Sequence, residues 1–281
     1  LATRRMPVDD TGRREAQERF ARFVAEAIGF DFSRGRLDRS THPFCGGSHG
    51  SDVRMTSRYS PRCLLDGMGS TMHESGHGMY EQGLDPRWIG TPMGEAVSLS
   101  IHESQSRLWE NQVGRSMQFW RWATPHMQRF FGAAAEGFTA EQVYEAANVV
   151  EPGFIRVDAA EGTYNMHVMV RFELEHEMIS RDMDLRELPA RWNALYKEFL
   201  GLDVPDDRRG CLQDVHWSGG MIGYFPTYTL GTLHAAQLFE AAREALPGLD
   251  EGFARGEFRP LREWLNTHVH RHGRRHLSAD L

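Results

Sequence analysis

Two histidines four residues apart, with a glutamate directly after the first, constrain this chain more than any other feature. The segment reads His73-Glu74-Ser75-Gly76-His77. A spacing of i and i+4 puts both imidazoles on one face of a helix, where they can hold one metal ion. The pattern therefore predicts a helix from Pro61 to about Gln82, despite several glycines. It also places Glu74 beside the metal, where it can take a proton from water.

A third ligand would complete such a site, and the sequence offers three carboxylates for it. Glu103 follows His77 by 26 residues, in a stretch from Pro92 to Met117 that we expect to be one helix. Glu95 competes on the same predicted helix, and Glu110 is the weaker candidate. Glu95 and Glu103 nearly share a helix face, so spacing alone leaves both open. Zinc suits two imidazoles and one carboxylate, because it accepts this donor set and keeps an open position.

The remaining patterns are mostly helical. Apolar residues recur at helical spacing over the segments 13–28, 120–133, 139–148, 163–180, 188–199, 224–245 and 259–270. Alternation over residues 52–59 predicts a short strand, residues 31–51 look like a loop, and Pro152-Gly153 indicates a hairpin over 149–158. We therefore expect a mainly α fold with a small β element beside the helix of the two histidines.

Composition excludes several function classes. Lys and Arg number 32 against 39 Asp and Glu, a net charge of −7, so no basic field favours nucleic acid. No apolar run is long enough to predict a membrane span. Three cysteines are too few for a disulfide framework or a thiolate cage, and we expect a reduced, cytoplasmic setting.

Six short motifs occur in the same order as in one known family. They are His42-Pro43-Phe44, Asp52-Val53-Arg54-Met55-Thr56, His73-Glu74-Ser75-Gly76-His77, His102-Glu103-Ser104-Gln105, Ile155-Arg156-Val157-Asp158-Ala159 and Gly210-Cys211-Leu212-Gln213-Asp214-Val215-His216-Trp217. Through them the chain resembles the carboxypeptidase Taq family of metallocarboxypeptidases. The resemblance implies a helical zinc-peptidase fold of the neurolysin-like type. It also implies removal of single C-terminal residues from peptides that carry a free C-terminal carboxylate.

The resemblance also assigns roles to individual residues. It implies that His73, His77 and Glu103, rather than Glu95, hold one zinc ion, for which cobalt is a possible substitute. Glu74 is then the catalytic base, and Arg156 grips the substrate carboxylate through its guanidinium group. A structural salt bridge is the alternative for Arg156. His216 and Tyr224 are expected to stabilise the oxyanion, with Tyr228 as an alternate or as a core tyrosine. Family members are commonly homodimers.

The chain departs from the family pattern at a few places. Ala160 stands where the family has an aspartate, which Glu161 can replace, and Gly219 stands where some relatives have a histidine. Family members are also longer. We therefore expect residues 1–281 to be a single catalytic domain that lacks the family's N-terminal helices and C-terminal end. Its metal-binding core, residues 42–228, would be part of a larger groove-containing fold.

Two further functions compete with the carboxypeptidase. One is a truncated, inactive homologue that serves as a metal-binding or partner-binding module. The presence of Glu74 favours the enzyme, because such a module needs no catalytic base. The other is an endopeptidase of the related oligopeptidase type, against which Arg156 and the ordered motifs argue.

Overall fold

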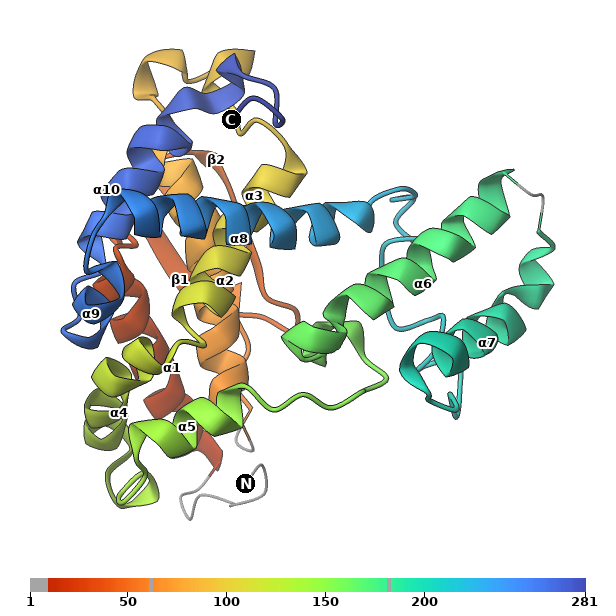
Figure 1. The fold of residues 1–281 in the computed structure, drawn as a ribbon, viewed down its shortest axis with the longest axis horizontal. Helices are drawn as coiled ribbons and strands as arrows, with labels where there is room; N and C mark the ends of the chain where they lie inside the picture. The colour runs from red at the N-terminus through yellow and green to blue at the C-terminus, as the bar shows by residue number, and fades with distance from the viewer. Residues whose placement is uncertain (1–9, 61–62, 181–182) are drawn as a thin grey trace. The chain divides into compact units, whose positions relative to one another are not determined.

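The computed structural model describes residues 10–60, 63–180 and 183–281, and it is mainly helical (Figure 1). The chain divides into two compact units, residues 1–147 with 231–281, and residues 148–230. The first unit contains α1 (Asp10–Ile28), α2 (Leu64–Gly83), α3 (Leu99–Arg107), α4 (Met117–Phe131), α5 (Ala140–Ala147), α9 (Leu249–Ala254) and α10 (Arg259–His268). The second contains α6 (Glu161–Ser180) and α7 (Leu188–Leu200), and α8 (Pro226–Ala245) runs across the boundary.

A three-stranded sheet belongs to the first unit. Its strands are β1 (Gly35–Arg39), β2 (Phe44–His49) and β3 (Asp52–Ser57), in the order β1-β3-β2. Strand β3 pairs in parallel with β1 and antiparallel with β2. Val53 and Met55 on β3 are buried. The predicted strand at 52–59 and the predicted small β element beside the helix of the two histidines are confirmed.

Helix α2 packs against β3, α1 and α3. Met68, Met72 and Met79 recur on it at helical spacing and are buried in the core of the first unit. Gly78 lies against Phe30 and against Val53 of β3, since a Cβ atom there would be 2.6 Å from the Phe30 ring and 3.4 Å from Cγ1 of Val53. The same core includes large aromatic side chains from α1, α4, α9 and the segments beside them: Phe20, Trp109, Phe119, Trp120, Phe253 and Phe258.

The second unit has a smaller core of its own. Helices α6 and α7 pack against each other (Figure 1). Leu174 of α6 and Leu195 of α7 are buried between them, and the rings of Trp192 and Tyr196 stack with centroids 5.0 Å apart. Arg171 of α6 lies over the Trp192 ring, with its guanidinium carbon 4.6 Å from the ring centroid. This core fixes the helix face from which Arg171 extends.

Three predictions about elements are wrong. Residues 31–51 are not a loop, since they contain β1 and β2. Residues 92–117 are not one helix, because a 3₁₀ turn at Pro92–Gly94 ends before the Ser98 side chain caps α3. After α3 the backbone continues as a π-helix over Leu108–Val113. Residues 149–158 form no hairpin, and their one regular element is a 3₁₀ turn at Arg156–Asp158.

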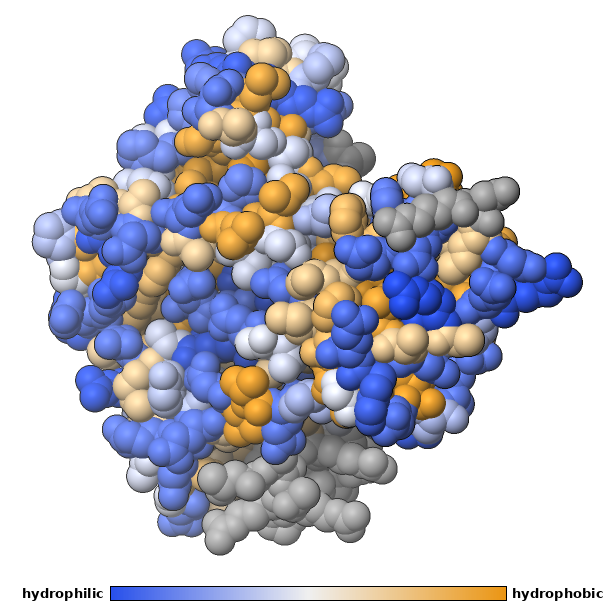
Figure 2. All heavy atoms as spheres, turned by 45° about the vertical axis from the view of Figure 1, so that its right-hand side comes forward, coloured by the Kyte–Doolittle hydropathy of each residue, from blue (hydrophilic) through white to orange (hydrophobic). Residues whose placement is uncertain are grey.

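Figure 2 shows one face on which hydrophilic residues predominate and hydrophobic residues gather in small areas. Small exposed apolar areas of this kind are normal on folded proteins. Within the described residues, no helix combines the length and the apolar character that crossing a membrane requires.

Candidate metal centre

Helices α2 and α3 bring two imidazoles and one carboxylate together. On α2 the rings of His73 and His77 have centroids 4.9 Å apart. Oε2 of Glu103, on α3, lies 3.8 Å from Nε2 of His73 and 3.5 Å from Nε2 of His77. In tetrahedral zinc sites, donors about 2.0–2.2 Å from the ion are about 3.3–3.6 Å from one another. The three side chains therefore have the composition and spacing of a metal site.

The two competing carboxylates lie elsewhere. Glu95 precedes α3 in extended backbone, and its exposed side chain pairs with Arg274 at 2.9 Å. Glu110 lies on the π-helix and is hydrogen bonded through Oε2 to Nδ1 of His73 at 2.9 Å. Glu110 thus contacts the imidazole nitrogen that faces away from Glu103.

A divalent cation fits this donor set. Glu103 is 6% exposed, and its Oε1 atom is buried without a hydrogen-bond partner among the residues that the structure describes. An orphaned carboxylate oxygen in the interior costs free energy unless a proton or a cation compensates it. Glu74, 5% exposed, and Glu110 add two further carboxylates around the same imidazoles. Arg107, 3.2 Å from Glu110, offsets one of these three carboxylate charges. With neutral imidazoles and ionised carboxylates the cluster therefore still carries excess negative charge, which a bound cation would reduce.

The pKa shifts reflect the same charge imbalance. Burial lowers the pKa of His73, but the nearby carboxylates of Glu103 and Glu110 outweigh it, so that the pKa is raised. Burial also raises the pKa of Glu74, and the charges of Glu103 and Glu110 add to this effect. The pKa of His77 is lowered, chiefly by burial. Without a metal, these shifts favour the protonated forms of His73 and Glu74.

Two glycines allow the close approach on which the cluster depends. A Cβ atom on Gly76 would lie 2.5 Å from the carbonyl oxygen of Gln105 and 2.6 Å from Cα of Ser106, so α2 and α3 meet backbone to backbone. Gly231 on α8 lies against Glu103 in the same way, with its Cβ position 2.5 Å from Cγ of the glutamate. A side chain at either position would displace Glu103 or its helix.

Gly76→Ala is therefore expected to destabilise the metal-free protein by about 1–3 kcal/mol, because the added methyl group meets backbone that cannot move aside cheaply. Metal affinity should fall as well, since α3 would move away from the imidazoles. Urea unfolding and chelator competition measure the two effects. Gly69→Ala is the matched control on the same helix, because its Cβ position has no neighbour within 4 Å. We expect Gly69→Ala to stabilise α2 by about 0.5–1 kcal/mol, and an equal loss in both variants would contradict the packing argument.

Three contacts around the imidazoles were not predicted from the sequence. Nδ1 of His77 lies 2.6 Å from Nδ1 of His102, and Nε2 of His102 lies 2.8 Å from Oε1 of Glu81. On the other side, Arg107 contacts Glu110 at 3.2 Å. The sequence does place Glu81 and His102 near the ligands, because Glu81 follows His77 by four residues and His102 directly precedes Glu103.

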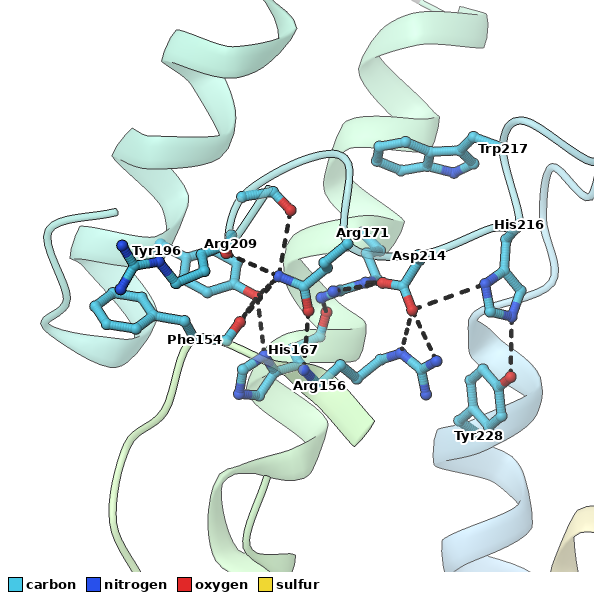
Figure 3. Close-up of polar contacts among 12 residues, drawn as sticks. Phe154, Arg156, His167, Arg171, Tyr196, Arg209, Asp214, His216, Trp217 and Tyr228 are labelled. Carbon is cyan, nitrogen blue, oxygen red and sulfur yellow. Dashed lines mark hydrogen bonds and ion pairs between the residues drawn. The ribbon is translucent and has the colours of Figure 1, made fainter. Parts of the chain in front are cut away.

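The other predicted site residues lie in the second unit. Arg156 is 4% exposed, and its Nε and Nη2 atoms donate to Oδ1 of Asp214 at 3.1 and 2.8 Å (Figure 3). Its Nη1 donates to the hydroxyl of Tyr164 at 2.9 Å. Arg171 reaches the other oxygen of the same carboxylate at 2.5 Å. The two arginines lower the pKa of Asp214, although burial opposes them. Among these three charged groups, one positive charge is in excess.

His216 and the two tyrosines form an adjoining group in the same unit. Nε2 of His216 is hydrogen bonded to the hydroxyl of Tyr228 at 2.9 Å, as Figure 3 shows. The His216 and Tyr224 rings have centroids 5.3 Å apart. The guanidinium carbon of Arg156 lies 4.6 Å from the centre of the Tyr228 ring. The structure thus gathers Arg156, His216, Tyr224 and Tyr228 within the second unit, while His73, Glu74, His77 and Glu103 belong to the first.

Comparison with known families agrees with the donor set. The family model for carboxypeptidase Taq (M32) metallopeptidase matches residues 4–281. The chain belongs to this family. Membership of this metallopeptidase family implies a divalent metal, and His73, His77 and Glu103 are the candidate ligands in this chain.

Individual relatives give the extent of the match. The chain is 47% identical to thermostable carboxypeptidase 1 of Thermus thermophilus, over 93% of this chain and 51% of that protein. It is 40% identical to carboxypeptidase 1 of Bacillus subtilis, over 95% of this chain and 54% of that protein. A carboxypeptidase structure from Deinococcus radiodurans superposes with a TM-score of 0.91 at 47% identity, covering 94% of this chain and 54% of that one. The chain thus spans about half the length of the relatives that it matches, and the predicted mainly helical peptidase fold is confirmed.

Proposed function

We propose that this chain carries the catalytic core of a zinc-dependent carboxypeptidase, which hydrolyses the last peptide bond of peptides and releases single C-terminal amino acids. One observation carries the proposal. Two helical imidazoles and a buried carboxylate with an orphaned oxygen converge beside Glu74, in a chain of the Taq metallopeptidase family. The carboxypeptidase relatives named above support the choice of reaction.

His73, His77 and Glu103 would hold the metal, for which we propose zinc, with cobalt as a substitute. Two nitrogen donors and one carboxylate are the donor set of catalytic zinc sites that leave a position open. When bound there, the metal would polarise the scissile carbonyl group and lower the pKa of a water molecule.

Glu74 would act as the general base. Its carboxylate takes a proton from the attacking water and passes it to the nitrogen of the leaving amino acid. The position of Glu74 next to His73 on α2 supports this role, and so does its burial, which excludes competing solvent.

The second unit would bind and stabilise the substrate. We propose that Arg156 binds the terminal carboxylate and that His216 and Tyr224 donate hydrogen bonds to the developing oxyanion, with Tyr228 as the alternate. The positive charge in excess around Asp214 supports an anion-binding role for Arg156.

The remaining proposals concern the setting of the enzyme. We propose a cytoplasmic protein, which the three free cysteines Cys45, Cys63 and Cys211 support. From the family resemblance we also propose a homodimer. Its substrates would be peptides with a free C-terminal carboxylate, and neither nucleic acid nor a membrane would be a partner.

Amidation of the peptide C-terminus tests the proposed reaction. If Arg156 binds the carboxylate through two charge-assisted hydrogen bonds, a free peptide should be cleaved about 100-fold or more faster than its amide, because each such bond contributes about 1.5–3 kcal/mol. Rates are compared by mass spectrometry of released residues, with and without a chelator. Equal cleavage of both peptides, or cleavage only at internal bonds, would exclude the carboxypeptidase.

Arg156→Lys separates substrate binding from a structural role. Lysine keeps the charge but loses the bidentate geometry, so the preference for free over amidated peptide should shrink by about 10-fold or more. This ratio does not depend on the amount of folded enzyme. If the preference is unchanged while the melting temperature falls, Arg156 only holds Asp214 in place.

A further inference from the structure

The two imidazoles of the metal centre have different hydrogen-bond partners on their outward nitrogens. Nδ1 of His73 contacts a carboxylate, Oε2 of Glu110, at 2.9 Å. Nδ1 of His77 instead contacts another imidazole, Nδ1 of His102, at 2.6 Å. His102 then contacts Oε1 of Glu81 at 2.8 Å through its Nε2 atom.

The positions of the protons follow from these contacts. The Nε2 atoms of His73 and His77 face Glu103, so each must offer a lone pair there to bind a metal. The proton of His77 must then lie on Nδ1 and be donated to His102. His102 can accept it only if its own proton lies on Nε2. That atom faces the carboxylate of Glu81, which can only accept.

We propose that His102, with its proton held on Nε2 by Glu81, orients His77 for metal binding by accepting the Nδ1 proton of His77. This inference rests on the proposed metal site and adds two positioning residues to it. Metal-bound histidines generally need such a partner on the second ring nitrogen, which fixes both the tautomer and the direction of the ring.

The fold holds both His102 and Glu81 in position. His102 lies on α3 directly before Glu103, while Glu81 lies on α2 four residues after His77. The His102 ring lies against the rings of His77 and Tyr80, with centroids 4.7 and 5.1 Å away. The hydroxyl of Tyr80 is itself fixed, since it accepts a hydrogen bond from the backbone nitrogen of Val97. The same pair of helices therefore supplies the ligands and the groups that orient one of them.

Two substitutions of His102 separate its two hydrogen bonds. His102→Asn places an acceptor oxygen where Nδ1 was and keeps the contact to His77, but it no longer reaches Glu81. His102→Gln reaches the position of Nε2 and can donate to Glu81, but it offers His77 no acceptor. We expect His102→Asn to bind Zn²⁺ within about 3-fold of the parent and His102→Gln to bind it about 10–100-fold more weakly.

The measurement is the Zn²⁺ dissociation constant of the 281-residue chain, obtained by competition with a chromogenic chelator. The visible spectrum of the Co²⁺-loaded protein provides a second readout that a purely structural role would not move. It should change in His102→Gln and stay close to the parent's in His102→Asn. The melting temperature of the metal-free protein shows whether each variant is folded.

Glu81 provides an independent pair of variants if a His102 variant fails to fold. Glu81→Gln keeps an acceptor oxygen for His102 and should leave Zn²⁺ affinity within about 3-fold of the parent. Glu81→Leu removes the acceptor, frees His102 to move its proton to Nδ1 and should weaken binding by about 10-fold.

The outcomes distinguish this inference from the proposed metal site. If His77→Ala binds Zn²⁺ as the parent does, the site itself is wrong and the inference falls with it. If His77→Ala loses the metal while both His102 variants keep parental affinity, or both lose it equally, His102 does not orient His77 and the inference alone is overturned. Weaker Zn²⁺ binding by His102→Gln and Glu81→Leu, with parental affinity in His102→Asn and Glu81→Gln, supports the inference.

Discussion

Replacing Glu103 with alanine is expected to remove the metal from this protein. The change deletes one of three ligands and leaves two imidazoles, whose outward nitrogens remain bound to Glu110 and His102. Loss of a group that only supports a ligand costs about 10–100-fold in metal affinity, so loss of the ligand itself should exceed about 100-fold. Zn²⁺ affinity by chelator competition, together with metal content after dialysis, measures the effect.

Glu95→Ala is the matched control, because it removes a carboxylate that lies close in sequence but not in space. Its side chain is 59% exposed and pairs with Arg274. Exposed ion pairs contribute about 0–1 kcal/mol, so this variant should keep both its stability and its metal. Equal metal loss in the two variants, or loss in Glu95→Ala alone, would contradict the assignment of Glu103 as ligand.

Residue spacing alone could not decide which of these two carboxylates is the ligand. Predicting one continuous helix over 92–117 put Glu95 and Glu103 about two turns apart on nearly one face. In the structure, the first turn of α3 starts only at Leu99, where the Ser98 side chain accepts a hydrogen bond from the backbone nitrogen of Ile101. Glu95 lies before this cap. The capping residue was visible in the sequence, but Thr91-Pro92 offered an equally good start for a helix.

Helix α2 was predictable because its metal-site residues and its core residues follow the same helical period. The spacing of His73 and His77 and the buried methionines require the same helical period. The glycines that weaken helix propensity have a tertiary reason, since Gly76 and Gly78 are packed against α3 and the sheet. No local rule reveals such a reason, because it depends on segments that are distant in sequence.

Strands β1 and β2 were missed for a related reason. Their glycines, Gly35, Gly46 and Gly47, indicate loops by composition. Strand β1 pairs in parallel with β3, a contact between segments separated by β2, and the register between β2 and β3 shifts between Gly46 and His49. A Cβ atom on Gly35 would lie 2.4 Å from the carbonyl oxygen of Val53, so glycine serves close strand pairing here rather than a turn.

In the second unit, the sequence motifs gave the site residues but not the contacts between them. Motif order identified Arg156 and His216, but it did not indicate that Asp214 would lie between Arg156 and the buried Arg171. Arg171 belongs to none of the six motifs, and an arginine on a helix is usually exposed. Only its full burial against Trp192 distinguishes it from a surface residue.

Glu74→Gln is expected to abolish most of the turnover while leaving the metal in place. The substitution keeps the volume of the side chain and removes only its charge, so the three ligands stay where they are. General base catalysis contributes about 10²–10⁴-fold, and the variant should therefore lose at least about 100-fold in kcat. The measurements are kcat on a peptide with a free C-terminus and the Zn²⁺ affinity of the same preparation.

The metal-free Glu74→Gln protein is expected to be as stable as the parent, so a loss of turnover cannot be due to unfolding. Burial and the charges of Glu103 and Glu110 raise the pKa of Glu74, which means that its ionised form is disfavoured in the folded protein. A neutral glutamine in its place should not lower the melting temperature of the metal-free protein. Glu95→Gln, which neutralises an exposed carboxylate, should keep parental turnover. If Glu74→Gln loses the metal together with its activity, Glu74 is a ligand rather than the base. If it keeps both, the proton is moved by another group, and the mechanism proposed for this chain is wrong.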